Sequence, residues 1–308
     1  MKAAQIRRQH LVSQVLLKQF TTARPEGSGL QLRPVDVRNP ERRNKLASTR
    51  TCGWADTFVA FDSASAEKLW DSVERGAHAA FEAVYAGTPF ADPLHVEALR
   101  DLVVLHYVRS HRYRSVYTNA FETVSVKLRG QLVRQYPEQL RREALRQTRL
   151  HLDGSGPLGV FAERLMEQSE VAQEFENGKL FRTSIEGMFH KVRAAAAKWH
   201  LEVLTPESGQ FLVGDNPAVS IRTDTKPLSY NMAFNDAHSI VLPISPRHLL
   251  ALGRENLVGS ISRSRVNDLN TVQIRAADHY VYLHPRSTRL ETFARDTARR
   301  WGADRSKR

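Results

Sequence analysis

The first residues that could do chemistry are a histidine and a glutamine near the N-terminus. In QHLVSQVLLKQF (9–20) the apolar residues at 11, 12, 15, 16, 17 and 20 follow a helical period. This pattern predicts a helix in which His10 and Gln14, four residues apart, share one face. Because an unperturbed histidine has a pKa of about 6.5, His10 could serve as acid, base or ligand, or it could be a structural residue.

A second group lies in LHYVRSHRYR (105–114), inside a long helical pattern. His106, Arg109 and Tyr113 are spaced 0, +3 and +7, which predicts one helix face, with Arg112 close to it. Guanidinium groups hold phosphate or carboxylate through paired hydrogen bonds. The segment therefore predicts an anion clamp at the edge of a cleft, and the alternative is a solvated basic helix surface.

The third group interrupts what otherwise reads as a strand, FLVGDNPAVSI (211–221). Asp215, Asn216 and Pro217 are typical turn residues, since Asp and Asn side chains bond to nearby backbone and proline fixes φ. A turn alone explains this stretch. However, the flanking apolar runs would hold Asp215 on a rigid sheet, where it could be a base, a metal ligand or the partner of an arginine.

Several familiar sites are missing from the sequence. GSGPLG (154–159) matches the dinucleotide pattern, but it follows a helical stretch and contains a proline, so it predicts a linker. The sequence has no Walker-type phosphate loop, no G-x-S-x-G and no H-E-x-x-H. The single cysteine, Cys52, excludes a zinc ribbon and is typical of a reducing cytoplasm. The sequence contains no run that reaches the ~20 apolar residues of a membrane span, and its first residues do not resemble a signal peptide.

The elements that must position these groups form three segments. Residues 1–63 predict a helix and strands, 64–198 are mainly helical, and 199–308 return to short strands before a basic terminal helix. The long pattern at 93–136 fits one kinked helix or two. Strands, then helices, then strands predict an α+β fold. In it, a mixed or antiparallel sheet built from N- and C-terminal strands packs against the helices, as one composite domain.

Charge is the clearest compositional feature. The 308 residues contain 45 Lys and Arg against 33 Asp and Glu, a formal net charge of +12. Residues 1–50 have 11 basic and 3 acidic side chains, residues 51–99 have 2 and 8, and residues 100–151 have 11 and 4. Such a distribution predicts RNA or DNA as a partner, and the alternative is an arginine-rich composition without a nucleic-acid role. Neither the oligomeric state nor a cofactor can be predicted from the composition.

Short motifs spread over almost the whole chain resemble the bacterial domain of unknown function 4238 family. They are HLVSQVLLKQF, RSHR, VGDNPAV, LPISP (242–246), and VNDLN followed by HYVYLHP. Two positions depart from the family pattern: Ser13 replaces a proline, and Gly214 replaces a hydroxyl residue before the aspartate. The resemblance implies that His10, Gln14, Arg109, Asp215 and Asn216 converge, and it supplies no established reaction.

Together these features predict a cytoplasmic nuclease of bacterial defence or toxin type. His10 is expected to be the general acid or base, Asp215 to orient it or bind a divalent metal ion, and Gln14 and Asn216 to complete the catalytic set. The expected substrate-binding residues are Arg109, Arg112, His106 and Asn270. The alternatives are a non-catalytic nucleic-acid or nucleotide binder, and a structural or partner-binding protein in which Asp215 and Arg109 form a buried ion pair.

Overall fold

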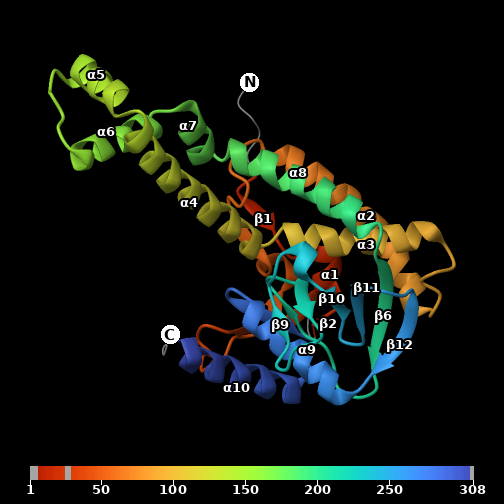
Figure 1. Cartoon of the computed structure of the whole chain (residues 1–308). Helices are drawn as coiled ribbons and strands as arrows, with labels where there is room; N and C mark the ends of the chain where they lie inside the picture. Colours follow the sequence, from red (N-terminus) through yellow and green to blue (C-terminus); the bar gives the residue numbers. More distant parts are fainter. Residues whose placement is uncertain (1–5, 25–28, 306–308) are drawn as a thin grey trace.

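Strands from the two ends of the chain lie in the body of the molecule, and helices from the middle of the chain pack over this body and extend away from it (Figure 1). The computed structural model describes residues 6–24 and 29–305. The larger sheet has six strands in the order β12-β6-β11-β10-β8-β9. Their bounds are β6 His200–Pro206, β8 Val219–Arg222, β9 Ser229–Tyr230, β10 Ser239–Ser245, β11 His248–Gly253 and β12 Leu257–Ile261. All neighbours are antiparallel except β12, which runs parallel to β6.

The second sheet joins the two ends of the chain. It contains β2 Thr22–Ala23, β3 Leu30–Asp36, β4 Ala47–Ser48, β7 Val213–Gly214 and β13 Tyr280–Leu283. β3 pairs with β13, so that Val35 lies opposite Val281. A separate pair is formed by β1 Arg8–His10 and β5 Trp54–Asp56. The predicted α+β class is therefore confirmed, including the contribution of N-terminal strands to a sheet with C-terminal ones.

Helices cover both faces of the larger sheet. On β10, Ile240 and Leu242 belong to the same apolar cluster as α2 Ser63–Tyr85, α3 Pro93–Val108 and α8 Lys179–Ala196. Val241, between them, faces the cluster of α9 Arg263–Ala276, as the alternation of side chains along a strand requires. The last helix, α10 Thr288–Arg305, packs on α9 and on the smaller sheet.

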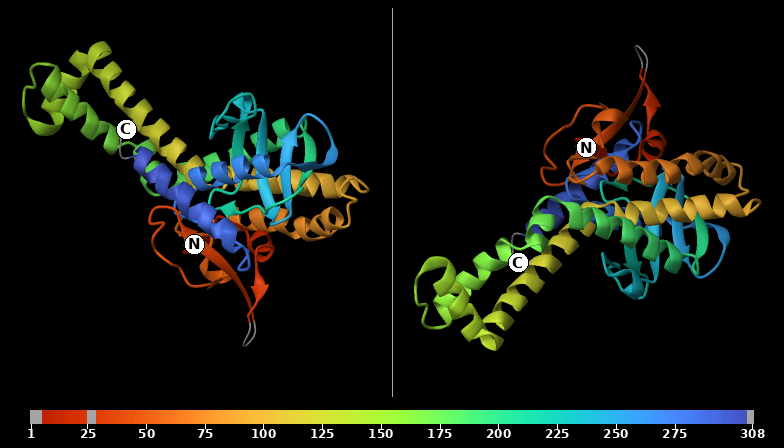
Figure 2. Two further views of the ribbon diagram at one scale, coloured as in Figure 1. Left: turned by 90° about the horizontal axis from the view of Figure 1, so that it is seen from below. Right: turned by 90° about the horizontal axis from the view of Figure 1, so that it is seen from above.

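Four helices project from this body as an arm: α4 His111–Gln135, α5 Pro137–Thr148, α6 Ser155–Glu167 and α7 Glu170–Glu176 (Figures 1 and 2). The arm has a small apolar cluster of its own around Leu140, Leu158 and Phe161. The GSGPLG stretch, predicted as a linker, contains the start of α6, which follows Gly154.

Two local predictions need correction, and both concern which residues share a helix. The 93–136 pattern forms two helices, one of the two alternatives that it predicts, because Arg109 ends α3 and the Ser110 hydroxyl caps α4 by accepting from the Tyr113 N–H. His106, Arg109 and Tyr113 therefore do not share a helix face. At the N-terminus the helix is only α1 Gln14–Lys18, capped by Ser13, while His10 lies on β1. The helical prediction was wrong there because Leu11 and Val12 donate to the Gly53 carbonyl instead.

Among the helices of the described residues, none combines the length and apolar character needed to cross a membrane.

Candidate functional site

A buried arginine lies where α3 gives way to α4. Arg109 is only 2% exposed, and its guanidinium donates to a Glu74 carboxylate oxygen at 2.7 Å. It also lies 4.9 Å from the ring centre of Trp70, in cation–π contact. Both partners come from α2, and they neutralise and shield a charge that would be costly to bury alone. We call this group, with His10, Gln14 and Glu67, the Arg109 centre.

His10 lies at the edge of this centre and is half-buried. The Gln14 side-chain amide donates to His10 Nδ1 at 3.1 Å and also to the Thr49 carbonyl at 2.8 Å, so the glutamine is fixed from two sides. Burial, and then the positive charge of Arg109, lower the pKa of His10, while Glu74 opposes this. His10 is therefore neutral at pH 7, with Nδ1 occupied as an acceptor. The contact between His10 and Gln14 is present, although a strand end and a helix start produce it rather than one helix face.

The sequence analysis missed the acidic side of the centre. Burial raises the pKa of Glu67 to about 7; the charge of Arg109 opposes the shift, while Asp71 and Glu74 add to it. Glu67, Trp70 and Glu74 are spaced 0, +3 and +7 on α2, which places them on one face. That spacing, inside the only acidic segment of the first 151 residues, was the available signal. A cavity of about 700 Å³ opens beside it and is lined by Lys68, Asp71, Glu74 and Arg75.

His106, predicted to bind substrate, is fully enclosed. Its Nε2 accepts from the Ser13 backbone N–H at 3.2 Å, and its Nδ1 lies 2.9 Å from the Leu102 carbonyl. Burial, and then the charge of Arg109, lower the pKa of His106 to about 3. The imidazole is therefore neutral, with its proton on Nδ1, and it fastens the start of α1 to α3.

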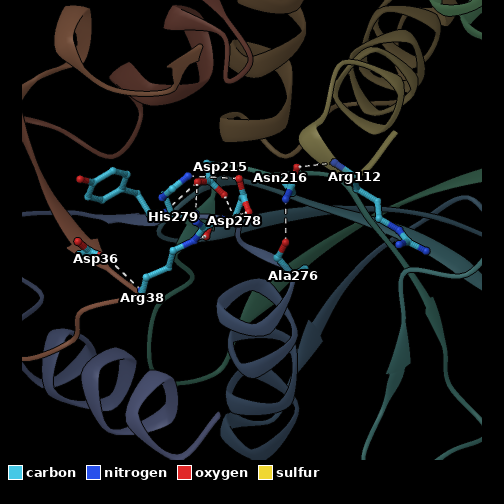
Figure 3. A network of polar contacts seen from close by, with 9 residues as sticks. Asp36, Arg38, Arg112, Asp215, Asn216, Ala276, Asp278 and His279 are labelled. Carbon is cyan, nitrogen blue, oxygen red and sulfur yellow. Dashed lines mark hydrogen bonds and ion pairs between the residues drawn. The ribbon is translucent and has the colours of Figure 1, made fainter. Parts of the chain in front are cut away.

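Asp215 braces the backbone of another segment (Figure 3). Its carboxylate accepts from three consecutive N–H groups, those of Asp278 at 2.7 Å, His279 at 2.7 Å and Tyr280 at 2.9 Å. Burial raises the pKa of Asp215, and these three donors oppose the shift. The carboxylate thus holds the turn that leads into β13. In the described residues, no hydrogen bond or ion pair joins the Asp215 carboxylate to Arg109, His10 or Gln14.

Asn216 links the arm to the body (Figure 3). Its side-chain oxygen accepts from the Arg112 backbone N–H at 3.4 Å, and its amide donates to the Ala276 carbonyl at 2.8 Å. The Arg112 guanidinium donates to the Asn231 carbonyl at 2.9 Å. Asn216 and Arg112 therefore lie together at the base of α4.

Asn270 acts with a residue that the sequence analysis did not single out. From α9, Asn270 accepts from the Leu212 N–H at 3.1 Å and donates to the Gln210 carbonyl at 2.9 Å. Gln273, one turn later, accepts from the Gly214 N–H at 2.9 Å and donates to the Pro217 carbonyl at 2.8 Å. These two amides clamp the stretch that contains Asp215. Glycine suits position 214, because an added Cβ would lie in close contact, 3.1 Å, with the Gln273 carbonyl oxygen.

The predicted site residues thus form two groups. His10, Gln14 and Arg109 meet in the Arg109 centre, while Asp215, Asn216, Arg112 and Asn270 lie around the turn at 214–217. Tyr282 connects the groups: its hydroxyl accepts from the Gly53 N–H at 2.9 Å, and burial together with the charge of Asp215 raises its pKa. In the described residues, no cluster of three or more His, Cys, Asp or Glu side chains could hold a metal ion.

Comparison with known proteins places the chain in a family. The family model described as "Protein of unknown function (DUF4238)" matches residues 8–287, so the chain belongs to that family. Comparisons with curated proteins and with solved structures each found no match.

Proposed function

We propose that this member of the DUF4238 family cleaves phosphodiester bonds in RNA or DNA, with His10 of the Arg109 centre as the acid–base residue. The observation that carries the proposal is the placement of His10 and Glu67, a histidine and a partly buried carboxyl group, around the buried Arg109. His10 is neutral at pH 7 because its pKa is lowered, whereas Glu67 is about half protonated because its pKa is about 7. A neutral base and a protonated acid near one cation are what hydrolysis at neutral pH requires.

In this mechanism Nδ1 of His10 gives up the hydrogen bond that it accepts from Gln14 and takes a proton from the attacking water as the new P–O bond forms. Glu67 gives its proton to the leaving oxygen as the old P–O bond breaks, so that protons and bonds balance. Arg109 is paired with Glu74 and supplies a fixed positive field rather than a direct phosphate contact. Lys68 and Arg75, which line the neighbouring cavity, are the cations available to the nucleic-acid backbone. We place this activity in the cytoplasm and in a bacterial defence or toxin role.

A structural role for the centre is the competing candidate, and the buried Arg109–Glu74 ion pair favours it. The two candidate functions assign different roles to His10. The His10 side chain is half-buried and accepts a hydrogen bond from Gln14, so it is not part of the Arg109–Glu74 ion pair. A purely structural centre would need the ion pair but not the His10 imidazole.

The test is cleavage of end-labelled RNA and DNA by the wild type and by His10→Ala, Glu67→Gln and His200→Ala. His200 is an exposed histidine on β6 and serves as the matched control. We expect His10→Ala to lose about 100-fold or more of the rate, and His200→Ala to lose none. The wild-type rate should fall above pH 7, where Glu67 loses its proton. Absence of cleavage by the wild type, or full activity of His10→Ala, would reject the proposal.

A further inference from the structure

A second cavity, of about 510 Å³, lies at the base of the arm, between the start of α4 and the end of α9. We call it the α4 cleft and define it by the polar side chains His111, Arg112, Arg114, Asn216, Asn231 and Arg275. It draws on a different set of residues from the Arg109 centre, and the proposed cleavage reaction makes no use of it.

Among the described residues, the arginines of the α4 cleft, Arg112, Arg114 and Arg275, have no carboxylate partner. In the part of the chain that the structure describes, none of the three is within ion-pair distance of an acid. Arg112 donates to the Asn231 carbonyl, and Arg114 donates to the Thr57 carbonyl at 3.4 Å. Arg275 lies over the Trp301 ring, and its buried Nε has no hydrogen-bond partner within the part of the chain that is described. The positive charge of these arginines is therefore available to an anionic ligand.

The two acids close to the cleft do not compensate for this charge. Asp278, which lines it, is paired with Arg38 on the other side of the turn (Figure 3). The Asp215 carboxylate is taken up by its three backbone donors. The N-terminus of α4 adds a partial positive charge to the same place, since the 25-residue helix begins at His111.

An apolar compartment adjoins the cationic one. It has a volume of about 190 Å³ and is lined by Tyr107, Tyr113, Val116 and Met232. Arg112, Asn216 and Asn231 line both compartments, so they form the boundary between them. A ligand that fills both compartments must combine an anionic group with a small apolar body. The side-chain amides of Asn216 and Asn231 would lie where these two parts of the ligand join.

We propose that the α4 cleft binds a nucleoside phosphate. The phosphate would lie among Arg112, Arg275 and the start of α4, where guanidinium groups and the positive end of the helix dipole favour it. The base would enter the apolar compartment between Tyr107 and Tyr113, with the Asn231 side chain available to its polar edge. The combined space is in the range of small-ligand sites. This site is independent of the proposed phosphodiester cleavage.

Isothermal titration with nucleoside monophosphates, the matching nucleosides and inorganic phosphate tests the proposal. We expect at least one nucleoside monophosphate to bind about tenfold or more tightly than either phosphate or the nucleoside alone. Arg112→Gln combined with Arg275→Gln should weaken binding about tenfold or more, because the anion loses two charged donors. Val116→Asp should weaken it as well, by placing a negative charge at the apolar compartment.

Two variants serve as controls. Arg222→Gln removes an arginine that pairs with Asp224 outside the cleft, and it should bind the ligand like wild type. His10→Ala should also bind normally, so a failure of cleavage and a failure of nucleotide binding can be told apart. No binding at millimolar ligand, or equal affinity for phosphate and for every nucleoside monophosphate, would overturn the proposal. Unchanged binding by the double arginine variant would overturn it too.

Discussion

Arg109 and Arg112 are three residues apart and carry the same side chain, yet their surroundings are opposite. Arg109 is buried, paired with Glu74 and covered by Trp70. Arg112 is exposed, donates to the Asn216 side-chain oxygen and the Asn231 carbonyl and, in the described residues, has no acidic partner. The break at Ser110 separates them, because it ends one helix inside the body and starts another that leaves it. A charge compensated within the chain stabilises the fold, whereas an uncompensated one is available for a ligand.

The largest expected effect comes from breaking the compensated pair. Arg109→Ala would leave the Glu74 carboxylate beside a buried space without its partner. Unfolding in urea should show a loss of about 3–5 kcal/mol in the free energy of unfolding. Arg112→Ala is the matched control, and its loss should stay within about 0.5 kcal/mol, as for an exposed side chain. Equal losses for the two variants would contradict the distinction between them.

An effect of intermediate size on stability is expected from pH, because two groups near Arg109 have shifted pKa values. One of them destabilises the fold as pH falls, and the other destabilises it as pH rises. The pKa of His106 is about 3 in the folded chain, below its unfolded value of about 6.5. The unfolded chain therefore binds more protons, and stability is lost as pH falls below 6.5, by about 1.4 kcal/mol per unit. The pKa of Glu67 is about 7 in the folded chain, above its unfolded value. The contribution of Glu67 to the free energy of unfolding is therefore fully present at low pH and is lost as pH rises towards 7.

The Glu67→Gln variant separates these contributions. It removes the carboxylate that is costly to ionise, so it should be more stable than wild type at pH 8 by about 1–2 kcal/mol, after allowance for its partial exposure. At pH 4 the two proteins should differ little, because Glu67 is protonated in both states of the wild type. Thermal and urea unfolding between pH 4 and 8 measures this. A constant difference across that range would show that Glu67 does not titrate as stated.

The smallest effect on stability is expected in the α4 cleft. Arg112→Gln combined with Arg275→Gln should change the free energy of unfolding by less than about 1 kcal/mol, since no ion pair is broken. The wild type, but not this variant, should melt at a higher temperature when a nucleoside monophosphate is added, because ligand binds only the folded chain. A large loss of stability in the double variant would mean that these arginines are structural, like Arg109.

The sequence predicted the positions of most elements, because their apolar periods are strong. The joining of β3 to β13 was also predictable from the order of strands and helices. The site was harder, for reasons visible in particular residues. Ser110 begins a helix inside a continuous helical pattern, so Arg109 and Arg112 looked like one clamp. Glu67 and Glu74 resembled an ordinary acidic surface, because nothing in the sequence shows that α2 faces a buried arginine.

Asp215 illustrates a different limit. The sequence indicated both a turn and a rigidly held carboxylate, and the structure contains both features. What could not be read was the identity of its partners, which are backbone groups of 278–280. Backbone donors leave no trace in residue type, so a carboxylate that braces a loop and one that meets a substrate look alike in sequence. The predicted catalytic role of Asp215 stays a prediction.

The pairing of β3 with β13 also constrains how the chain can fold during synthesis. Arg38, just after β3, donates to the carbonyl of Asp278, 240 residues later. Since synthesis proceeds at roughly 5–20 residues per second, β13 leaves the ribosome on the order of 10–50 s after β3. During that interval β3 has an unpaired edge towards the future β13, and such edges can recruit other strands. A newly made chain is therefore expected to depend on the helical body, or on a chaperone, to keep this edge apart from other chains until translation ends.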